Sequence, residues 1–220
     1  MPHSQPDGYL AIPPIGKGPG VLVLHAWWGL NETIKAFCER LAQAGFVAFA
    51  PDLYHGKVAN TIPEAEMLGK VVDANFAQTK AEVAAAALFL GERAGHPDQG
   101  LAVIGFSLGA YYAVDLAAAD PEHIRSVVLF YGTGDADLSN SQAAFLGHYA
   151  ENDQYEAPAN VDAMEAYLKR IGRPVTFHRY SGTAHWFFEP DRVREFNQAA
   201  ASLAWDRTLA FVKKSAQSVA

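Results

Sequence analysis

The chain of 220 residues contains a single cysteine, Cys38. One cysteine cannot form an internal disulfide bond, so nothing in the sequence calls for an oxidising compartment. The N-terminus has no basic cluster followed by an apolar run, and the longest apolar run, from Val83 to Leu90, is too short to span a membrane. We therefore predict a soluble, cytoplasmic protein.

Positive charge is also scarce. Lys and Arg total 17 against 24 Asp and Glu, which gives a formal net charge of −7. This balance argues against nucleic acid or an anionic membrane as the main partner. Hydrophobic residues nonetheless make up 50% of the chain and aromatic residues 12%, which is enough for a buried core and excludes disordered and fibrous proteins.

The sequence lacks the usual patterns of a metal or nucleotide site. It has neither an H-E-x-x-H motif nor a cluster of Cys and His residues, so we predict no metal ion. The glycine-rich segment Gly16–Gly20 opens a strand rather than a helix and lacks the spacing of a dinucleotide fingerprint. This segment therefore does not indicate a bound dinucleotide.

Apolar runs of strand length alternate with segments of helical periodicity along the whole chain. This alternation predicts one α/β domain over residues 1–220 with a doubly wound, mostly parallel sheet. No helical segment separates the first two runs, Tyr9–Ile12 and Val21–Ala26, so we expect them to pair as antiparallel neighbours. The other expected strands cover residues 46–50, 101–106, 125–131, 143–150 and 174–180. The first expected helix begins at Asn31 and can end at Gly45. The other expected helices cover residues 63–93 (with a break near Asp73), 108–119, 160–171 and 191–214.

Sites in doubly wound sheets form at the carboxyl ends of the strands. There, Gly105–Gly109 reads G-x-S-x-G between a hydrophobic strand and a helix, which is typical of a nucleophile elbow. The serine of such a turn has a strained backbone, and a side chain at either glycine would collide with it. We therefore predict that Ser107 is a nucleophile and that the backbone N–H of Leu108 is an oxyanion-hole donor.

A serine hydroxyl needs a base, and in this kind of site an acid and then a histidine follow the serine in the chain. His123 would enter a strand at the wrong edge of the sheet. His148 and His178 lie inside strands, where we expect a buried structural role. His185 follows the last strand and is the predicted base.

Two aspartates compete for the role of the acid that orients the histidine. Asp153 lies in a turn just after the expected strand 143–150, whereas Asp135 follows the preceding strand beside two glycines. Ordinary turn chemistry explains an aspartate beside glycines. We therefore favour Asp153 and keep Asp135 as the alternative.

The loop after the expected strand Val21–Ala26 should supply the second oxyanion donor, and the backbone N–H of Trp27 has the right place in it. Aromatic residues also gather in loops at the carboxyl ends of strands. We predict that Trp28, Tyr54 and Trp186 bind substrate in an aromatic-walled pocket, although part of this set is expected to serve packing alone.

These segments together resemble the dienelactone hydrolase family of the α/β-hydrolase superfamily. The match runs over Val21–Asn31, Ala50–Tyr54, the Gly105–Gly109 turn, Asp153 and the His185 segment. The resemblance implies a small α/β hydrolase without a lid domain, which acts on esters or lactones through a triad and without a cofactor. It also favours Asp153 over Asp135, because Asp153 matches the position of the family's acid.

The chain departs from that family at three positions. Members named for dienelactone hydrolysis have a cysteine at the position of Ser107 and a glutamate at that of Ala26, so the resemblance implies a serine variant. They also hold a substrate carboxylate with arginines, one of which stands at the position of Glu189. We therefore expect anionic substrates to be disfavoured, since Glu189 and the net charge of −7 would repel them.

The predicted function is hydrolysis of the ester or lactone bond of small, uncharged substrates by Ser107, His185 and Asp153. A thioesterase or acyltransferase with the same three residues is the alternative among enzymes. A binding protein on the same fold is the alternative outside them, and the complete set of three residues argues against it. The expected partner is thus a small-molecule ester or lactone, and the sequence leaves open whether the protein is a monomer or a small homo-oligomer.

Overall fold

The computed structural model describes residues 4–95 and 100–217, so residues 1–3, 96–99 and 218–220 of the predicted unit 1–220 lie outside the described part. Within these ranges seven strands form one sheet in the order β1-β3-β2-β4-β5-β6-β7. The strands are β1 (Gly8–Ala11), β2 (Gly20–Leu24), β3 (Val47–Pro51), β4 (Leu101–Phe106), β5 (Ile124–Phe130), β6 (Ala144–Asn152) and β7 (Val175–Ala184). The helices are α1 (Glu32–Gln43), α2 (Ile62–Ala74), α3 (Phe76–Arg93), α4 (Leu108–Ala119), α5 (Pro158–Arg170) and α6 (Gln198–Gln217).

The predicted doubly wound, mostly parallel α/β fold is confirmed, with one error in strand pairing. β1 is the antiparallel edge strand, but it pairs with β3, with Tyr9 opposite Ala50, and not with β2. The prediction that the first two apolar runs pair is therefore wrong. The crossover through α1 places β3 beside β2 in parallel, as a strand–helix–strand unit does, and β1 can then pair only with the free edge of β3.

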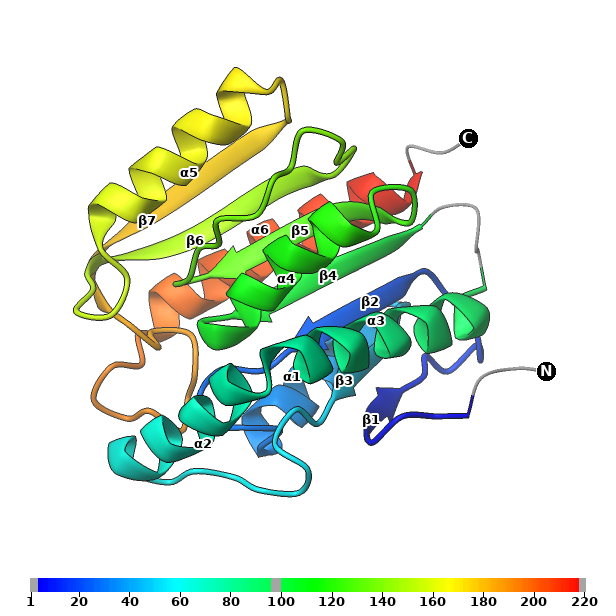
Figure 1. Cartoon of the computed structure of the whole chain (residues 1–220), viewed down its shortest axis with the longest axis horizontal. Coiled ribbons are helices and arrows are strands. Elements are labelled where there is room, and N and C mark those ends of the chain that lie inside the picture. The colour runs from blue at the N-terminus through cyan, green and yellow to red at the C-terminus, as the bar shows by residue number, and fades with distance from the viewer. Residues whose placement is uncertain (1–3, 96–99, 218–220) are drawn as a thin grey trace.

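Helices cover both faces of the sheet (Figure 1). α1 and α6 pack on one face, whereas α3, α4 and α5 pack on the other and α2 lies against α3. Because β2 to β7 are parallel, their carboxyl ends meet at one edge, where the loops that follow them come together. Of the helices in the described ranges, none is long and apolar enough to cross a membrane.

The limits of the first helices follow local sequence signals. The Asn31 side chain accepts a 3.1 Å hydrogen bond from the backbone N–H of Ile34 and caps α1. The chain leaves α1 through Gly45 at φ +99°, a conformation that glycine adopts without strain. α2 and α3 are separated at Asn75, close to the break that was predicted near Asp73.

The C-terminal helix begins later than the sequence predicts. α6 starts at Gln198 and not at residue 191. Asp191 instead accepts hydrogen bonds from the side chains of Asn31 (3.2 Å) and Thr33 (2.8 Å), which tie residue 191 to the start of α1. A long-range tie of this kind overrides the helical periodicity of the segment.

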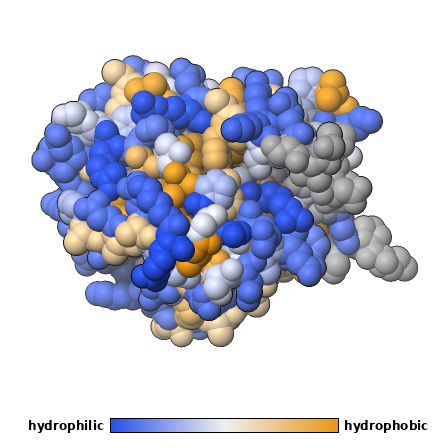
Figure 2. Space-filling model, turned by 90° about the horizontal axis from the view of Figure 1, so that it is seen from above, coloured by the Kyte–Doolittle hydropathy of each residue, from blue (hydrophilic) through white to orange (hydrophobic). Residues whose placement is uncertain are grey.

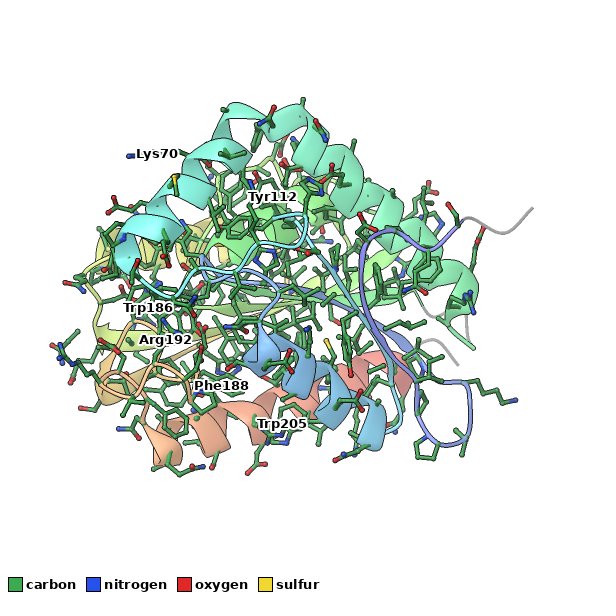
Figure 3. The ribbon with its side chains drawn as sticks, turned by 90° about the horizontal axis from the view of Figure 1, so that it is seen from below. Lys70, Tyr112, Trp186, Phe188, Arg192 and Trp205 are labelled. Atoms are coloured by element: carbon green, nitrogen blue, oxygen red, sulfur yellow. The ribbon has the colours of Figure 1, made fainter. Side chains whose placement is uncertain are left out.

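A cluster of aromatic side chains fills the sheet face behind the predicted elbow. Phe37 of α1 contacts Phe106, Phe130, Phe188 and Trp205 edge-on, with ring centroids 5.2, 6.4, 5.6 and 5.4 Å away. Figure 3 labels Phe188 and Trp205, which come from the loop after β7 and from α6. Phe106 and Phe130 are the last residues of β4 and β5, so this packing fixes the strand ends that lead into the site.

The surface is mainly polar. Seen from above, it is mainly hydrophilic with small hydrophobic areas between (Figure 2). The most exposed large hydrophobic side chains include Ile15 (75% exposed) and Val193 (84% exposed), which belong to separate loops, whereas Met67 and Val71 lie one turn apart on α2. Some exposed apolar side chains are normal on globular proteins.

Candidate active site

Ser107 occupies the sharp turn between β4 and α4. Its backbone has φ 49° and ψ −112°, a positive φ that residues other than glycine rarely adopt. A Cβ atom at Gly105 would collide with the backbone of Gly109, and one at Gly109 would collide with the carbonyl oxygen of Leu24. Gly105 thus permits the sharp turn into α4 and Gly109 the close approach of the turn to β2, so the Ser107 hydroxyl is held at the carboxyl end of β4.

The structure brings together the three residues that were predicted to react. Ser107 Oγ lies 3.0 Å from His185 Nε2, and both carboxylate oxygens of Asp153 lie 2.8 Å from His185 Nδ1. The side chains of His185 and Asp153 are only 3% and 4% exposed, so little water competes for their hydrogen bond. This arrangement can move a proton from Ser107 to His185 and stabilise the imidazolium with a carboxylate.

Asp153 is held by the turn that follows β6. Its Oδ1 atom accepts hydrogen bonds of 2.9 Å from the backbone N–H groups of Tyr155 and Glu156. The neighbouring Glu151 points elsewhere and accepts hydrogen bonds from the hydroxyl of Ser181 and the N–H of Gly182. The turn therefore fixes the Asp153 carboxylate in the orientation that faces His185.

The competing candidates lie apart from this cluster. Asp135 lines a separate, larger cavity between α4 and α5. His123 precedes β5 at the opposite edge of the sheet, where it forms a 2.7 Å contact with Asp120. Neither residue is among the hydrogen-bond partners of Ser107 and His185.

His148 and His178 lie on neighbouring strands, with their rings stacked 6.0 Å apart. The two ring nitrogens of His148 are hydrogen bonded to the hydroxyls of Tyr180 (2.8 Å) and Thr208 (3.0 Å). Complete burial lowers the pKa of His148 well below its usual range, so the ring is neutral at physiological pH. His148 is thus a hydrogen-bonded core residue, as its position inside a strand predicts.

The two predicted oxyanion donors lie at the start of α4 and in the loop after β2. Leu108 is the first residue of α4, and the first N–H groups of a helix have no acceptor within the helix. Trp27 lies in the loop after β2 and lines the same cavity as Ser107. Their role toward an oxyanion stays a prediction.

A cavity of about 210 Å³ surrounds the Ser107 hydroxyl. Its lining includes no Lys or Arg, contains the carboxylate of Glu156, and is otherwise mainly aromatic. The lining residues are Trp27, Ser107, Tyr131, Gly132, Thr133, Tyr155, Glu156, His185 and Trp186. Space of this size fits a small reacting group between aromatic walls.

Of the three residues predicted to bind substrate, Trp186 lines this cavity, whereas Trp28 and Tyr54 do not. Trp28 is 3% exposed and lies beneath the guanidinium of Arg192, whose central carbon is 3.9 Å from the ring centroid. Trp28 also packs edge-on against Trp186, and Figure 3 labels Trp186 and Arg192 in the loop after β7. Tyr54 is 4% exposed and packs on the ring of His25 at 4.9 Å. Both rings are buried in packing contacts outside the cavity lining, and the predicted contact of Trp28 and Tyr54 with substrate stays a prediction.

The sequence did not predict five residues of the cavity wall: Tyr131, Gly132, Thr133, Tyr155 and Glu156. A signal existed for the first three, because Tyr131 ends a predicted strand and Gly132 and Thr133 follow it directly. A Cβ atom at Gly132 would lie 2.6 Å from the carbonyl oxygen of Ser107, so this glycine lets β5 approach the elbow. Tyr155 and Glu156 carried no such signal, since they reach the cavity only through the turn around Asp153.

Glu189, which was expected to repel anions, lies outside the cavity lining. Its side chain is 1% exposed, and Oε1 accepts a 2.6 Å hydrogen bond from the Tyr131 hydroxyl. The pKa of Glu189 is raised to about 8, mainly by burial and also by nearby Asp191, whereas the hydrogen bond from Tyr131 and the charge of Arg192 oppose the shift. Glu189 is then mostly protonated at pH 7, and the acidic residue of the cavity lining is Glu156 and not Glu189.

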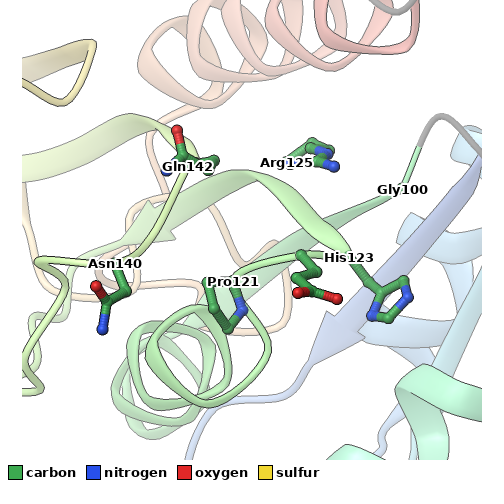
Figure 4. Close-up of a pocket in the computed structure, with 7 residues that line it drawn as sticks. Gly100, Pro121, His123, Arg125, Asn140 and Gln142 are labelled. Atoms are coloured by element: carbon green, nitrogen blue, oxygen red, sulfur yellow. The ribbon is translucent and has the colours of Figure 1, made fainter.

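The described part of the chain holds no group of three or more His, Cys, Asp or Glu side chains placed to bind a metal ion. A cavity of about 600 Å³ lies at the amino ends of β4, β5 and β6, lined by residues that include His123, Arg125 and Gln142 (Figure 4). None of the predicted reacting residues lines it. The smaller cavity at Ser107 is therefore the candidate for chemistry.

Comparison with known proteins places these features in context. The model of the dienelactone hydrolase family matches residues 7–216. "Protein usf" of Aquifex pyrophilus is 33% identical over 214 residues, which covers 94% of this chain and 92% of the relative. A "Putative carboxymethylenebutenolidase" of Aquifex aeolicus (strain VF5) is 32% identical over 217 residues, with coverage of 94% and 92%. The crystal structure of a "Putative Dienelactone Hydrolase" from Klebsiella pneumoniae subsp. pneumoniae MGH 78578 is similar with a TM-score of 0.76 at 27% identity, over 92% of this chain and 88% of that chain.

Proposed function

This chain belongs to the dienelactone hydrolase family, and we propose that it hydrolyses small, uncharged carboxylic esters or lactones through a serine nucleophile. Membership of the family gives the coarser activity, which is hydrolysis of lactone or ester bonds. The observation that carries the finer proposal is the chain of contacts from Ser107 Oγ through His185 to Asp153, at 3.0 and 2.8 Å. The aromatic cavity around it supports a small substrate.

The first half of the reaction forms an acyl-enzyme. His185 Nε2 takes the hydroxyl proton as Ser107 Oγ attacks the carbonyl carbon, and the electron pair of the C=O bond moves to its oxygen. The N–H groups of Leu108 and Trp27 stabilise this oxyanion. The C–O bond then breaks as the pair returns, and His185 gives its proton to the leaving alkoxide, which for a lactone stays attached to the acyl group.

The second half repeats these steps with water. His185 takes a proton from water while the hydroxide attacks the acyl carbon, and the proton returns to Ser107 Oγ as the acid leaves. Asp153 orients the histidine and stabilises the imidazolium in both halves, through its short bond to Nδ1. Apart from the substrate and one water molecule, every group that reacts in these steps is a residue of the chain.

The decisive experiment pairs Ser107→Ala with an active-site label. Ser107→Ala should lower kcat by about a thousandfold or more on short neutral esters. A fluorophosphonate probe should inactivate the wild-type protein, and mass spectrometry should find the phosphonyl group on Ser107. Circular dichroism should show the same fold for both proteins, because removing one partly exposed hydroxyl costs little stability.

Ser139→Ala is the matched control, since Ser139 is an exposed serine outside the cavity lining. It should keep wild-type activity and labelling. If Ser107→Ala retained a tenth of the activity, or the label went to another residue, the proposed nucleophile would be wrong.

A further inference from the structure

A larger groove opens next to the cavity at Ser107. It has a volume of about 750 Å³ and lies between α4, the loop after β5 and α5. Thr133 lines both the groove and the Ser107 cavity, so the two spaces meet at this residue. A substrate whose carbonyl lies at Ser107 can therefore extend past Thr133 into the groove.

The boundary between the two spaces is a fixed hydrogen-bonded set. Thr133 Oγ1 donates to Glu156 Oε2 at 3.0 Å, and Asn160 Nδ2 donates to Glu156 Oε1 at 3.0 Å. Glu156 lines the small cavity and Asn160 lines the groove. Both carboxylate oxygens are thus engaged from neighbouring segments, which holds the Glu156 carboxylate and the Thr133 and Asn160 side chains in fixed positions at the boundary.

The walls of the groove suit a neutral aromatic group. Tyr111 of α4 and Tyr167 and Met164 of α5 contribute rings and a thioether, both of which pack well on aryl groups. The Tyr167 hydroxyl is held, since it accepts from the N–H of Leu138 at 2.8 Å and donates to Asp137 at 3.2 Å. Its ring is therefore presented in a fixed orientation.

The groove carries charges of both signs, two carboxylates and one guanidinium. Asp135 and Asp137 are exposed carboxylates, and the Asp137 carboxylate already accepts from Tyr167 and from the N–H of Ser139. Arg170 supplies the opposing positive charge, with its guanidinium carbon 5.3 Å from the Tyr167 ring centroid. An ionic substituent of either sign would meet a like charge here, whereas a neutral aryl group meets the rings.

We propose that the groove between α4 and α5 is a subsite for a neutral aryl arm of the ester or lactone whose carbonyl reacts at Ser107. The identity of the arm as part of a substrate rests on the proposed function. The cavity at Ser107 has a volume of only about 210 Å³, and the groove adds a second binding region to it. The groove therefore selects among esters by the substituent that lies remote from the reacting bond. Esters with a phenyl group on an alkyl arm should then bind more tightly than simple alkyl esters with the same reacting group.

A binding experiment tests this without turnover. The chain has three methionines, and of these Met164 lines the groove while Met67 is 60% exposed on α2. With [methyl-13C]methionine, titration with 4-phenylbutan-2-one, an unreactive ketone analogue of an aryl ester, should shift the Met164 methyl resonance and leave that of Met67 in place. Butan-2-one, which lacks the ring, should leave Met164 unchanged at the same concentration.

Two matched tryptophan variants locate the effect. Ala163→Trp places a bulky ring inside the groove, whereas Ala166→Trp places the same ring on an exposed position of α5 outside the lining. Ala163→Trp should abolish the Met164 shift, and Ala166→Trp should retain it. Ala136→Trp closes the groove from the opposite wall and replaces Ala163→Trp if that protein does not fold.

Kinetics give the second readout. We compare kcat/KM for two phenyl-bearing esters with that for ethyl acetate. The ring is in the alcohol part of 2-phenylethyl acetate and in the acyl part of ethyl 3-phenylpropanoate. Ala163→Trp should lower the aryl-to-ethyl ratio by about tenfold in at least one pair, while Ala166→Trp leaves the ratio at the wild-type value.

The outcomes separate this inference from the proposed function. A Met164 shift that is absent, or that persists unchanged in Ala163→Trp, would overturn the subsite even if Ser107 proves to be the nucleophile. Conversely, a specific Met164 shift in a protein whose Ser107→Ala variant keeps its activity would leave the aryl site standing and overturn the proposed nucleophile.

Discussion

The Tyr131 hydroxyl donates a 2.6 Å hydrogen bond to the carboxyl group of Glu189, and the Tyr131 ring centroid lies 4.8 Å from that of His185. Tyr131 follows β5, whereas Glu189 belongs to the loop that carries His185. The bond therefore ties two segments of the site together behind the histidine. Tyr131 has φ +39°, an uncommon value for this residue type, and it is completely buried where both its ring and its hydroxyl are engaged.

The buried Glu189 carboxyl should make stability depend on pH. In the folded protein burial raises the pKa of Glu189 to about 8, whereas in the unfolded chain it has its ordinary value near 4.5. Its contribution is most favourable below the unfolded pKa and is lost as the pH rises to about 8, because only the unfolded chain releases the proton over that interval. Between pH 5 and 8, wild-type protein should lose on the order of 3 kcal/mol relative to Glu189→Gln.

Urea unfolding of wild-type protein and Glu189→Gln at pH 5, 6, 7 and 8 measures this difference. The subtraction cancels the titration of all other groups, which the two proteins share. Glu66→Gln removes an exposed carboxylate of α2 and should run parallel to wild type. Equal pH dependence for Glu189→Gln and wild type would show that Glu189 is ionised in the folded protein.

The choice between the two acid candidates can be made by substitution. Asp153→Asn should lower kcat by about three to four powers of ten, because an amide at 2.8 Å from Nδ1 favours the wrong histidine tautomer. Asp135→Asn should leave the turnover of short esters near the wild-type value, since Asp135 lines the neighbouring groove. Steady-state kinetics of the two variants on one short neutral ester decides the matter, and the reverse order would move the acid to Asp135.

The parts of the site that the sequence predicts are those with local causes. The Gly105–Gly109 turn is specified by steric requirements within five residues, and the Asn31 cap by a side chain three residues from its partner. His185 follows from topology, because the ends of parallel strands meet at one edge. These inferences need no knowledge of how distant side chains pack.

The features that the sequence did not predict all depend on distant contacts. β1 pairs with β3 because the α1 crossover fills the place beside β2, and the start of α6 is displaced by the bonds of Asp191 to the α1 terminus. The burial of Trp28 needs Arg192 above its ring, and that of Glu189 needs Tyr131 from another strand end. No local pattern around these residues indicates such partners, so an aromatic or acidic residue in a loop was interpreted as facing substrate.

Glu156 should determine how the enzyme discriminates between anionic and neutral esters. It is the carboxylate of the cavity lining beside the reacting residues, and no Lys or Arg is among the lining residues to offset it. Glu156→Gln should raise kcat/KM for an anionic ester such as monoethyl succinate by about fivefold to tenfold relative to its neutral diethyl ester at low salt. The gain should shrink at high salt, where charges are screened.

Glu122→Gln is the control for this change, because it alters the net charge by the same amount. Glu122 lines the cavity at the amino ends of the strands, away from Ser107. It should leave the ratio of anionic to neutral ester unchanged. An equal gain in both variants would assign the discrimination to the net charge of −7 and not to the site.

Thiol reagents should spare the enzyme, because the only cysteine, Cys38, lies on the inner face of α1 with no exposed surface. Burial also raises the pKa of the Cys38 thiol well above its usual range, so the reactive thiolate is scarce. Iodoacetamide at pH 8 should therefore leave both the mass and the ester hydrolysis of the folded protein unchanged. The same treatment in urea should add one carbamidomethyl group, which shows that the reagent is active. Rapid alkylation of the folded protein with loss of activity, slowed by substrate and accompanied by no phosphonate label on Ser107, would place the chemistry on Cys38 instead of Ser107.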